Sequence, residues 1–293
     1  MIEKTISDGY FREHPLPKHG GGDKHSRGRV LVIAGHVDVP GAALLAGLGA
    51  LRAGAGVLRI ATCRTNAPHL RIAMPEALVV ACSENAQGEI AAENGQRLTE
   101  MASSSDAVLV GPGMMDEPSA RELCAMLLEG AEGPHFVLDA AAFTSLRDMK
   151  VPSFQQGRIV CTPHFGEMAK FLGWAREQVE NDAVGAARAA ACLLGAVVAL
   201  KGSRTQIVSP EGEVLLNDHG AIGLATSGSG DTLSGILAGL LARATPPQLA
   251  TAWAVYMHAE AGLRLSKRIG PLGFLAREIP DEIPAIMREL GGE

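Results

Sequence analysis

Short apolar runs recur along this chain, and most of them end at a glycine or at a polar residue. Runs of this kind, rich in β-branched residues and bounded by turn residues, are typical of strands that are buried on both faces of a sheet. The runs that we predict to be strands are 29–34, 57–62, 77–82, 107–111, 135–139, 159–162 and 196–201.

The segment between the first two predicted strands has the pattern of a helix. Residues 40–52 are rich in alanine, glycine and leucine, and Gly54-Ala-Gly56 follows them as a stop signal. A strand, a helix and a strand in this order form a βαβ unit, which implies a parallel sheet and a right-handed crossover. The small residues on the helix permit close packing on the sheet or on another helix.

Further along the chain, helical and extended patterns continue to alternate. Residues 186–200 predict a buried helix followed by a buried strand, and residues 205–217 predict a β-hairpin. Residues 248–258 and 260–268 have helical spacing, and proline-containing segments follow from residue 271 to residue 284. We therefore predict an α/β fold, a three-layer sandwich in which helices flank a central, mostly parallel sheet.

The domain organisation follows from where these patterns begin. Residues 1–28 are polar, which predicts a loose N-terminal lead-in or a loop that orders over a ligand. We find no internal repeat and no linker between residues 29 and 290. We therefore predict a single domain over residues 29–293.

The composition excludes several classes of function. Hydrophobic residues make up 47% of the 293 residues, which supports a sizeable core, whereas a net charge of −6 and 4% aromatic residues argue against nucleic-acid binding. The five cysteines lack CxxC spacing, so we predict neither a disulfide framework nor a zinc site. No apolar run reaches the ~18 residues of a membrane span, and the N-terminus lacks the apolar core of a signal peptide. We expect a cytoplasmic protein without a membrane partner.

The stretch Gly220–Leu241 carries the clearest chemical signal. Its first half is rich in glycine, serine and threonine, and from Thr232 the apolar residues follow helical spacing. A helix therefore begins near Gly228-Ser229-Gly230-Asp231. The unpaired amides and positive partial charge of a helix N-terminus, approached by glycines, suit a phosphate group.

Asp231 gives this helix start a second possible role. Aspartate is a favoured N-cap, and a capping role alone would leave a nucleotide-binding protein without turnover. An acid beside a phosphate cradle is also well placed to take a proton from a hydroxyl group that attacks the terminal phosphorus. We predict that Asp231 is the catalytic base.

Four other polar stretches follow predicted strands, where open α/β sheets bind ligands. They are Gly111-Pro-Gly113, Asp139, Thr162–Glu167 and Lys201–Thr205. Each has a simple structural interpretation as a tight turn, a helix cap or a solvated strand end. In the functional interpretation, His164 faces a ligand, the Lys201–Thr205 turn holds a nucleotide, and Asp139 orders magnesium through water.

Together these motifs resemble the ADP/ATP-dependent NAD(P)H-hydrate dehydratases, which have the ribokinase-like fold. Gly41-Ala-Ala with Gly54-Ala-Gly56 and the segment Ala225–Asp231 complete the match, which covers about residues 24–290. The elements Thr162-Pro-His164-Phe-Gly-Glu167 and Lys201-Gly-Ser-Arg-Thr205 separate the chain from sugar kinases, which share mostly the Gly-x-Gly-Asp loop.

The resemblance implies a metabolite-repair lyase that uses ADP or ATP to dehydrate the 6S hydrate of NADH or NADPH. The residues that would contact the hydrate are Ala42, Gly113, His164 and Asp231. Those that would hold the adenine nucleotide are Lys201, Gly202, Ser203, Arg204, Thr205, Gly228, Ser229 and Gly230. The resemblance also implies Mg²⁺, with its ligands left open, and we expect a homo-oligomer.

The chain departs from the family pattern in three places. Asp139-Ala140-Ala141 stands where Asp-Ala-Asp is frequent, which weakens a metal role for the second acid. Gly35-His36 stands where Gly-Ser is common. The epimerase domain fused to many relatives is absent from this sequence, so we expect a separate protein to epimerise the hydrate. The alternative enzyme is a small-molecule kinase for a vitamin precursor or sugar, which would stop at the phosphoryl ester.

Overall fold

The computed structural model describes residues 3–17 and 23–291, and one ten-stranded sheet runs through them. The strands are β1 (Glu3–Thr5), β2 (Arg29–Ile33), β3 (Val57–Cys63), β4 (Ala77–Cys82), β5 (Ala107–Val110), β6 (His135–Leu138), β7 (Ile159–Cys161), β8 (Val197–Leu200), β9 (Thr205–Val208) and β10 (Val214–Asn217). Their order across the sheet is β1-β10-β9-β8-β7-β6-β5-β2-β3-β4. Within the described chain, β9 is antiparallel to its neighbours β8 and β10, and all the other pairs are parallel. The predicted mostly parallel α/β sheet is confirmed.

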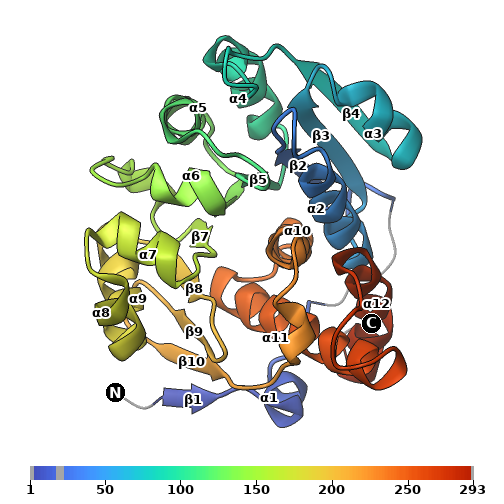
Figure 1. Ribbon diagram of the computed structural model, residues 1–293, viewed down its shortest axis with the longest axis vertical. Helices are drawn as coiled ribbons and strands as arrows, with labels where there is room; N and C mark the ends of the chain where they lie inside the picture. The colour runs from blue at the N-terminus through green and yellow to red at the C-terminus, as the bar shows by residue number, and fades with distance from the viewer. Residues whose placement is uncertain (1–2, 18–22, 292–293) are drawn as a thin grey trace.

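Helices cover both faces of this sheet (Figure 1). One layer holds α1 (Asp8–Glu13), α2 (Gly41–Arg52), α3 (Ala67–Ala73), α10 (Ser229–Ala242), α11 (Pro247–Arg268) and α12 (Ile279–Glu289). The other holds α4 (Gly95–Ser103), α5 (Glu117–Gly130), α6 (Ala140–Thr144), α7 (Phe165–Leu172), α8 (Arg176–Asn181) and α9 (Ala183–Leu194). Short 3₁₀ helices lie at Ala92–Asn94, Ser153–Gln155, Ile222–Leu224 and Ala276–Glu278.

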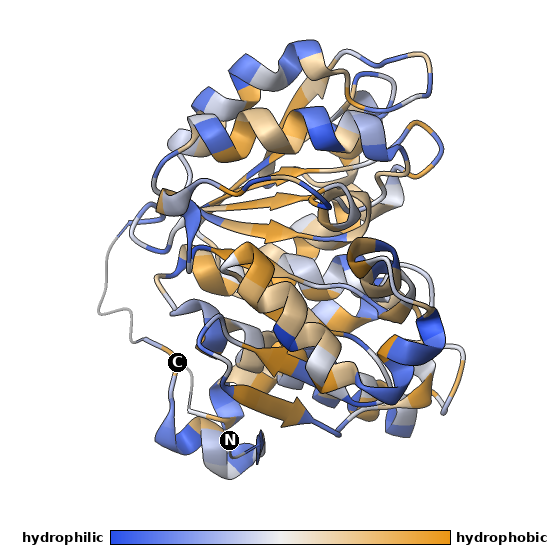
Figure 2. Ribbon diagram, turned by 90° about the vertical axis from the view of Figure 1, so that its left-hand side faces the viewer, coloured by the Kyte–Doolittle hydropathy of each residue, from blue (hydrophilic) through white to orange (hydrophobic). Residues whose placement is uncertain are grey.

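The apolar runs of the sequence exist because each strand supplies two cores at once. In β2, Val30 and Val32 pack into the core under α2 and α10, whereas Leu31 and Ile33 pack into the opposite core. Successive side chains of a strand point to opposite faces, so a strand covered on both sides has no polar position. Figure 2 shows the result as apolar strands between helices whose outer surfaces are largely polar.

The N-terminal segment is not a loose lead-in over residues 3–17, so this expectation is wrong there. β1 pairs in parallel with β10, and the fully buried Phe11 of α1 packs against Trp253 with ring centroids 4.6 Å apart. Trp253 Nε1 also donates a hydrogen bond of 3.0 Å to the His14 carbonyl oxygen. Residues 18–22 of the predicted ligand-covering loop lie outside the described residues.

The C-terminal region also differs from its predicted form. The two predicted helical stretches form one continuous helix, α11. α12 forms within the proline-containing segment because Pro280 sits in its first turn, where a missing amide hydrogen costs little. No helix of the described residues is long and apolar enough to cross a membrane.

Glycine-mediated packing holds α10 against α2. A Cβ atom at Gly235 would lie 2.1 Å from the Ala46 carbonyl oxygen, and one at Gly239 would lie 2.5 Å from the Ala50 carbonyl oxygen. Both contacts advance by four residues on each helix, so the two helices run in the same direction and in register. If the same spacing is continued by one helical turn toward the N-termini, Ala42 of α2 lies opposite Asp231 of α10.

We expect Gly235→Ala to destabilise the fold, because the added methyl group has no space beside the backbone of α2. Overpacking of this kind costs about 1–3 kcal/mol, which urea unfolding would measure as a lower midpoint. Gly41→Ala is the matched control, since nothing lies within 4 Å of a Cβ atom at that position. An unchanged midpoint for Gly235→Ala would contradict the packing that we describe.

Candidate active site

The carboxyl ends of neighbouring parallel strands bring the predicted polar stretches to one edge of the sheet. The strand register places Ile33, Val110, Leu138 and Cys161 in one row across β2, β5, β6 and β7. The row continues at Val198 of β8, and three residues further along a parallel bridge joins His164 to Lys201, directly after β8. The stretches that follow these strands therefore lie side by side, as the sequence predicts for a doubly covered α/β sheet.

The end of β6 and the end of β8 are joined by an ion pair. Lys201 Nζ lies 3.0 Å from Asp139 Oδ1, and the Thr162 hydroxyl donates to the same oxygen at 2.8 Å. Asp139 occupies the N-cap position of α6, but its side chain makes no capping bond and pairs with Lys201 instead. Burial alone would lower the pKa of Lys201, but the nearby carboxylates of Asp139, Glu167 and Asp231 outweigh burial and raise it.

Asp231 lies in the first turn of α10, close to this ion pair. The N-cap of α10 is Gly228, with φ of 85° and no side-chain capping bond, so the interpretation of Asp231 as the cap is wrong. Burial raises the pKa of Asp231 to about 7; the charges of Asp139 and Glu167 add to the effect, and Lys201 opposes it. A carboxylate with this pKa can both accept and release a proton at neutral pH.

A cavity of about 780 Å³ opens beside the N-terminus of α10, on the side of Lys201. Six of the predicted nucleotide-binding residues line it, namely Lys201, Gly202, Ser203, Thr205, Ser229 and Gly230. The far wall is mostly apolar and includes Ile222, Leu224, Val255 and Ala259. This size and the presence of both a cationic side chain and apolar side chains suit a ligand with a charged group and a flat apolar part.

Two predicted nucleotide residues are not among those that line this cavity. Arg204 projects toward Asp218, with 3.9 Å between Nη2 and Oδ2, and its side chain is more than half exposed. Gly228 instead forms the entry to α10, where a Cβ atom would lie 2.3 Å from Leu45 Cδ1. Its left-handed conformation and this close contact both require glycine.

His164 both caps helix α7 and lines the cavity beside Lys201. Its Nδ1 accepts hydrogen bonds from the amides of Gly166 at 2.9 Å and Glu167 at 3.2 Å, which caps α7. Its Nε2 lies 3.3 Å from Glu167 Oε1, and the ring lines the cavity. Burial raises the pKa of Glu167, as does Asp139, and Lys201 counteracts them.

The remaining predicted hydrate residues, Ala42 and Gly113, lie next to each other. A Cβ atom at Gly113 would be 2.7 Å from Ala42 Cβ and 3.4 Å from Gly35 Cα. Neither residue lines the cavity beside Lys201. Because Ala42 is level with Asp231 on the paired helices, this second surface lies on the α2 side of Asp231.

Comparison with known proteins identifies the family. The family model described as NAD(P)H-hydrate dehydratase matches residues 30–285. The chain belongs to the NAD(P)H-hydrate dehydratase family. It is 44% identical over 98% of its length to the ADP-dependent (S)-NAD(P)H-hydrate dehydratase of Xanthomonas campestris, of which it covers 97%.

Solved structures of this family have the same fold. The ADP/ATP-dependent NAD(P)H-hydrate dehydratase of Bacillus subtilis, co-crystallised with ATP and Mg²⁺, superposes with a TM-score of 0.83 and 29% identity over 98% of both chains. A ribokinase-like superfamily protein of Enterococcus faecalis gives a TM-score of 0.86 and 27% identity, covering 99% of this chain and 97% of that one. The predicted ribokinase-like fold is confirmed.

One family motif of the sequence does not belong to this site. Gly54-Ala-Gly56 follows the C-terminus of α2, at the end opposite to Ala42. A Cβ atom at Gly56 would lie 1.7 Å from the Lys24 carbonyl oxygen, and one at Gly54 would lie 3.0 Å from Arg243 Nη1. These glycines therefore serve close packing at the far edge of the sheet.

Sequence reasoning missed His258, which lies on α11 and reaches the start of α10. Its Nε2 lies 3.0 Å from both the hydroxyl and the carbonyl oxygen of Ser229. Burial lowers the pKa of His258 to about 4, so the ring is neutral at physiological pH. A histidine inside a regular helical pattern gives no signal in sequence that it contacts a loop 29 residues away.

The raised pKa of Asp231 predicts a stability that falls as pH rises. Between its ordinary value of 3.8 and its folded value of about 7, the folded chain binds more protons at this group than the unfolded chain does. Asp231→Asn should therefore be more stable than the wild type at pH 8, by up to about 4 kcal/mol, and the difference should disappear near pH 4. Urea unfolding at both pH values would measure this, and a difference independent of pH would contradict it.

Proposed function

We propose that this chain is a nucleotide-dependent NAD(P)H-hydrate dehydratase, a hydro-lyase that restores NADH or NADPH from the 6S hydrate. The observation that carries the proposal is the position of Asp231. A buried acid with a pKa near 7 sits in the first turn of a helix whose amides have no side-chain cap, beside Lys201 and a nucleotide-sized cavity. Family membership favours this reaction over the kinase alternative.

In this proposal the adenine nucleotide occupies the cavity beside Lys201. Its terminal phosphates lie against Gly230 and Lys201, where the amides of α10 and the ammonium group provide positive charge. A Cβ atom at Gly230 would lie 3.3 Å from Lys201 Nζ, so glycine leaves this approach open. The adenine ring of the nucleotide lies toward the apolar side chains of Leu224 and Val255.

The hydrate binds on the other side of Asp231. Ala42 and Gly113 present small surfaces there, which admit a ring close to the backbone. His164 lines the nucleotide cavity, and we assign its Nε2 to the hydrate on the family resemblance. In this arrangement Asp231 faces the C6 hydroxyl of the hydrate, and that hydroxyl faces the terminal phosphorus.

The chemistry proceeds in balanced steps. Asp231 takes the hydroxyl proton as the C6 oxygen bonds to the terminal phosphorus, and the bond from that phosphorus to the nucleotide breaks. The lone pair of the ring nitrogen then expels the phosphate with the C6–O bond electrons. Transfer of a proton from C5 to the expelled phosphate restores the dihydropyridine ring. The amides of α10 and the charge of Lys201 stabilise the negative charge on the transferring group.

Magnesium enters this scheme with the nucleotide rather than as a resident ion. The described residues contain no group of three or more His, Cys, Asp or Glu side chains that could hold a metal. Asp139 is engaged by Lys201 and Thr162, and alanine occupies position 141. Mg²⁺ is commonly carried by substrate phosphates, so we treat it as part of the nucleotide substrate.

The assembly and location complete the proposal. The chain works as a homo-oligomer in the cytoplasm. The location rests on the scattered cysteines, which lack CxxC spacing.

The reaction is tested by following phosphorus and the reduced nicotinamide together. With purified 6S hydrate and nucleotide labelled in the terminal phosphate, we expect one free phosphate and one reduced dinucleotide per nucleotide consumed. Asp231→Asn should lower the rate about 10²–10⁴-fold and still bind nucleotide, because it removes the base but not the cavity. Label that accumulates in a stable organic ester would instead identify a kinase.

The two ligands should respond to different substitutions. His164→Asn keeps an acceptor for the amides that cap α7 but loses the reach of Nε2, so it should weaken hydrate binding about tenfold. Ser203→Asp adds a negative charge to the nucleotide cavity and should weaken ADP or ATP binding by a similar factor. Titration calorimetry with each ligand separates the effects.

Ser203 is preferable here to Gly202, because a Cβ atom at Gly202 would lie 2.7 Å from the ring of Phe165, next to His164. If both variants lose both ligands equally, our assignment of the two surfaces is wrong.

A further inference from the structure

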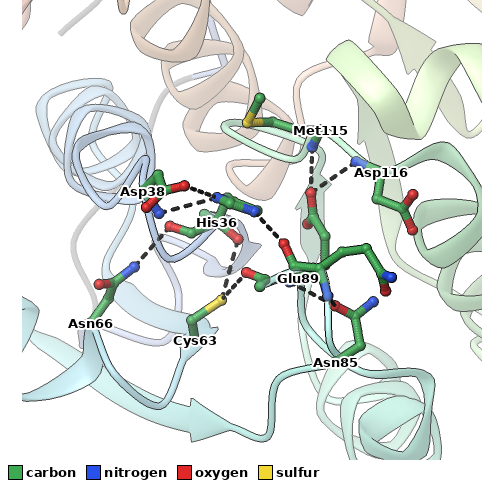
Figure 3. A network of polar contacts seen from close by, with 11 residues as sticks. His36, Asp38, Cys63, Asn66, Asn85, Glu89, Met115 and Asp116 are labelled. Atoms are coloured by element: carbon green, nitrogen blue, oxygen red, sulfur yellow. Dashed lines mark hydrogen bonds and ion pairs between the residues drawn. The ribbon is translucent and has the colours of Figure 1, made fainter.

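A second polar network surrounds Glu89 and includes the backbone of Met115 and Asp116, shortly after Gly113 (Figure 3). It joins four segments, which are the segment after β2, the end of β3 with the segment that follows it, the segment between β4 and α4, and the segment after β5. The residues that make its contacts are His36, Asp38, Cys63, Asn66, Asn85, Gln87, Gly88, Glu89, Met115 and Asp116. None of these residues has a role in the chemistry derived above.

Glu89 is the charged centre of this network. Its side chain is 2% exposed, and its Oε1 accepts hydrogen bonds from the amides of Met115 at 2.5 Å and Asp116 at 2.9 Å. Asn85 fixes the backbone of Glu89 in turn, since Asn85 Oδ1 accepts from the Glu89 amide at 3.0 Å. No cation of the described residues pairs with Glu89. A buried carboxylate without a cation is costly, so these two charge-assisted bonds fix the loop strongly.

These two bonds act directly behind the Gly113 turn. Met115 and Asp116 come two and three residues after Gly113, whose φ of 72° marks a tight turn. On the other side of the turn, the Pro112 carbonyl oxygen accepts a hydrogen bond of 2.8 Å from the Gly35 amide. Hydrogen bonds therefore fix the turn on both sides of Gly113. The Gly35 amide binds the residue before it, and Glu89 binds the amides of the residues that follow.

His36 links its own loop, which follows β2, to the loop between β4 and α4 that contains Glu89. Its Nε2 lies 2.6 Å from the Gln87 carbonyl oxygen, and its Nδ1 accepts a hydrogen bond of 3.0 Å from the Asp38 amide. A carbonyl oxygen requires a donor and an amide requires an acceptor, so these contacts select the neutral ring with its proton on Nε2. The histidine that replaces the family's usual serine thus links the two loops on either side of the Gly113 turn.

We propose that Glu89 is a positioning residue for the hydrate. By fixing the backbone after Gly113, Glu89 holds the Gly113 turn in the position in which Ala42 and Gly113 together contact the substrate. This inference rests on the proposed function, because it takes that surface as the hydrate site. Glu89 acts through the backbone and does not touch the substrate. Small shifts of such a turn change the affinity for the ligand that lies on it and leave the separate nucleotide cavity unchanged.

The test compares three variants in steady-state kinetics with hydrate and nucleotide. Glu89→Ala removes the acceptor and should raise KM for the hydrate at least tenfold, while KM for the nucleotide stays within twofold. Glu89→Gln keeps an oxygen acceptor for both amides and should restore KM for the hydrate to within about threefold of wild type. Glu93→Ala is the matched control, because Glu93 is an exposed acid of the same loop that bonds to Ser83 rather than to the Gly113 turn.

Amide hydrogen exchange provides a readout that needs no substrate. Glu89→Ala should speed exchange at Met115 and Asp116 and leave exchange in α10 unchanged. Faster exchange there with an unchanged KM for the hydrate would overturn the positioning role. An equal rise in KM for both substrates would show a merely structural role and would also overturn it. A wild-type enzyme that leaves the hydrate untouched would refute the proposed function itself, and the inference would fall with it.

Discussion

The ammonium group of Lys201 lies at the end of β8, within the field of three carboxylates. It pairs directly with Asp139 at 3.0 Å, and its charge lowers the pKa of both Glu167 and Asp231 against the effect of burial. One cation faces three carboxylates here, so their negative charge is only partly balanced. Burial is the main cause of the raised pKa of Asp231, about 7, and the charges of Asp139 and Glu167 add to it. A bound nucleotide adds negative charge at the same place and competes with these acids for Lys201.

The fold brings this cluster together by two independent constraints. Parallel strands in register place Asp139, Thr162 and Lys201 at adjacent strand ends, because the residue that follows each strand emerges at the same edge. Asp231 does not come from the sheet at all. It reaches the cluster because glycines at 235 and 239 let α10 run against α2 at backbone distance, with both helix N-termini at the same level. The geometry of this cluster is thus a consequence of sheet register on one side and of glycine packing on the other.

The sheet can be predicted from the sequence because strands buried on both faces have no polar positions, as Leu31 and Val32 illustrate. The Gly228–Asp231 loop can also be predicted as a candidate phosphate site, because glycines directly before an apolar helix indicate a backbone that a phosphate group can approach. The partners of side chains are much harder to predict. Asp139 resembles a helix cap in sequence because capping is local, whereas its actual partner, Lys201, is 62 residues away. α1 escapes prediction because one buried aromatic residue, Phe11, anchors an otherwise polar segment. Glu89 resembles any loop acid, since its acceptor role is visible only where the backbone after Gly113 passes it.

The two surfaces beside Asp231 are built from different kinds of interaction, and this difference matches what each would have to bind. The nucleotide side combines a cation, open helix amides and an apolar wall, so it can attract a highly charged ligand from solution. On the hydrate side, most of the contacts are hydrogen bonds to backbone groups, which fix loops in place without a net attraction for charge. A tight turn between Gly35 and Glu89 cannot move far to accommodate a different ring. Discrimination between a damaged nicotinamide and the many other hydroxyl compounds of a cell would then come from the shape of this rigid surface, whereas the charged cavity would supply the phosphoryl group to whatever hydroxyl that surface holds against Asp231.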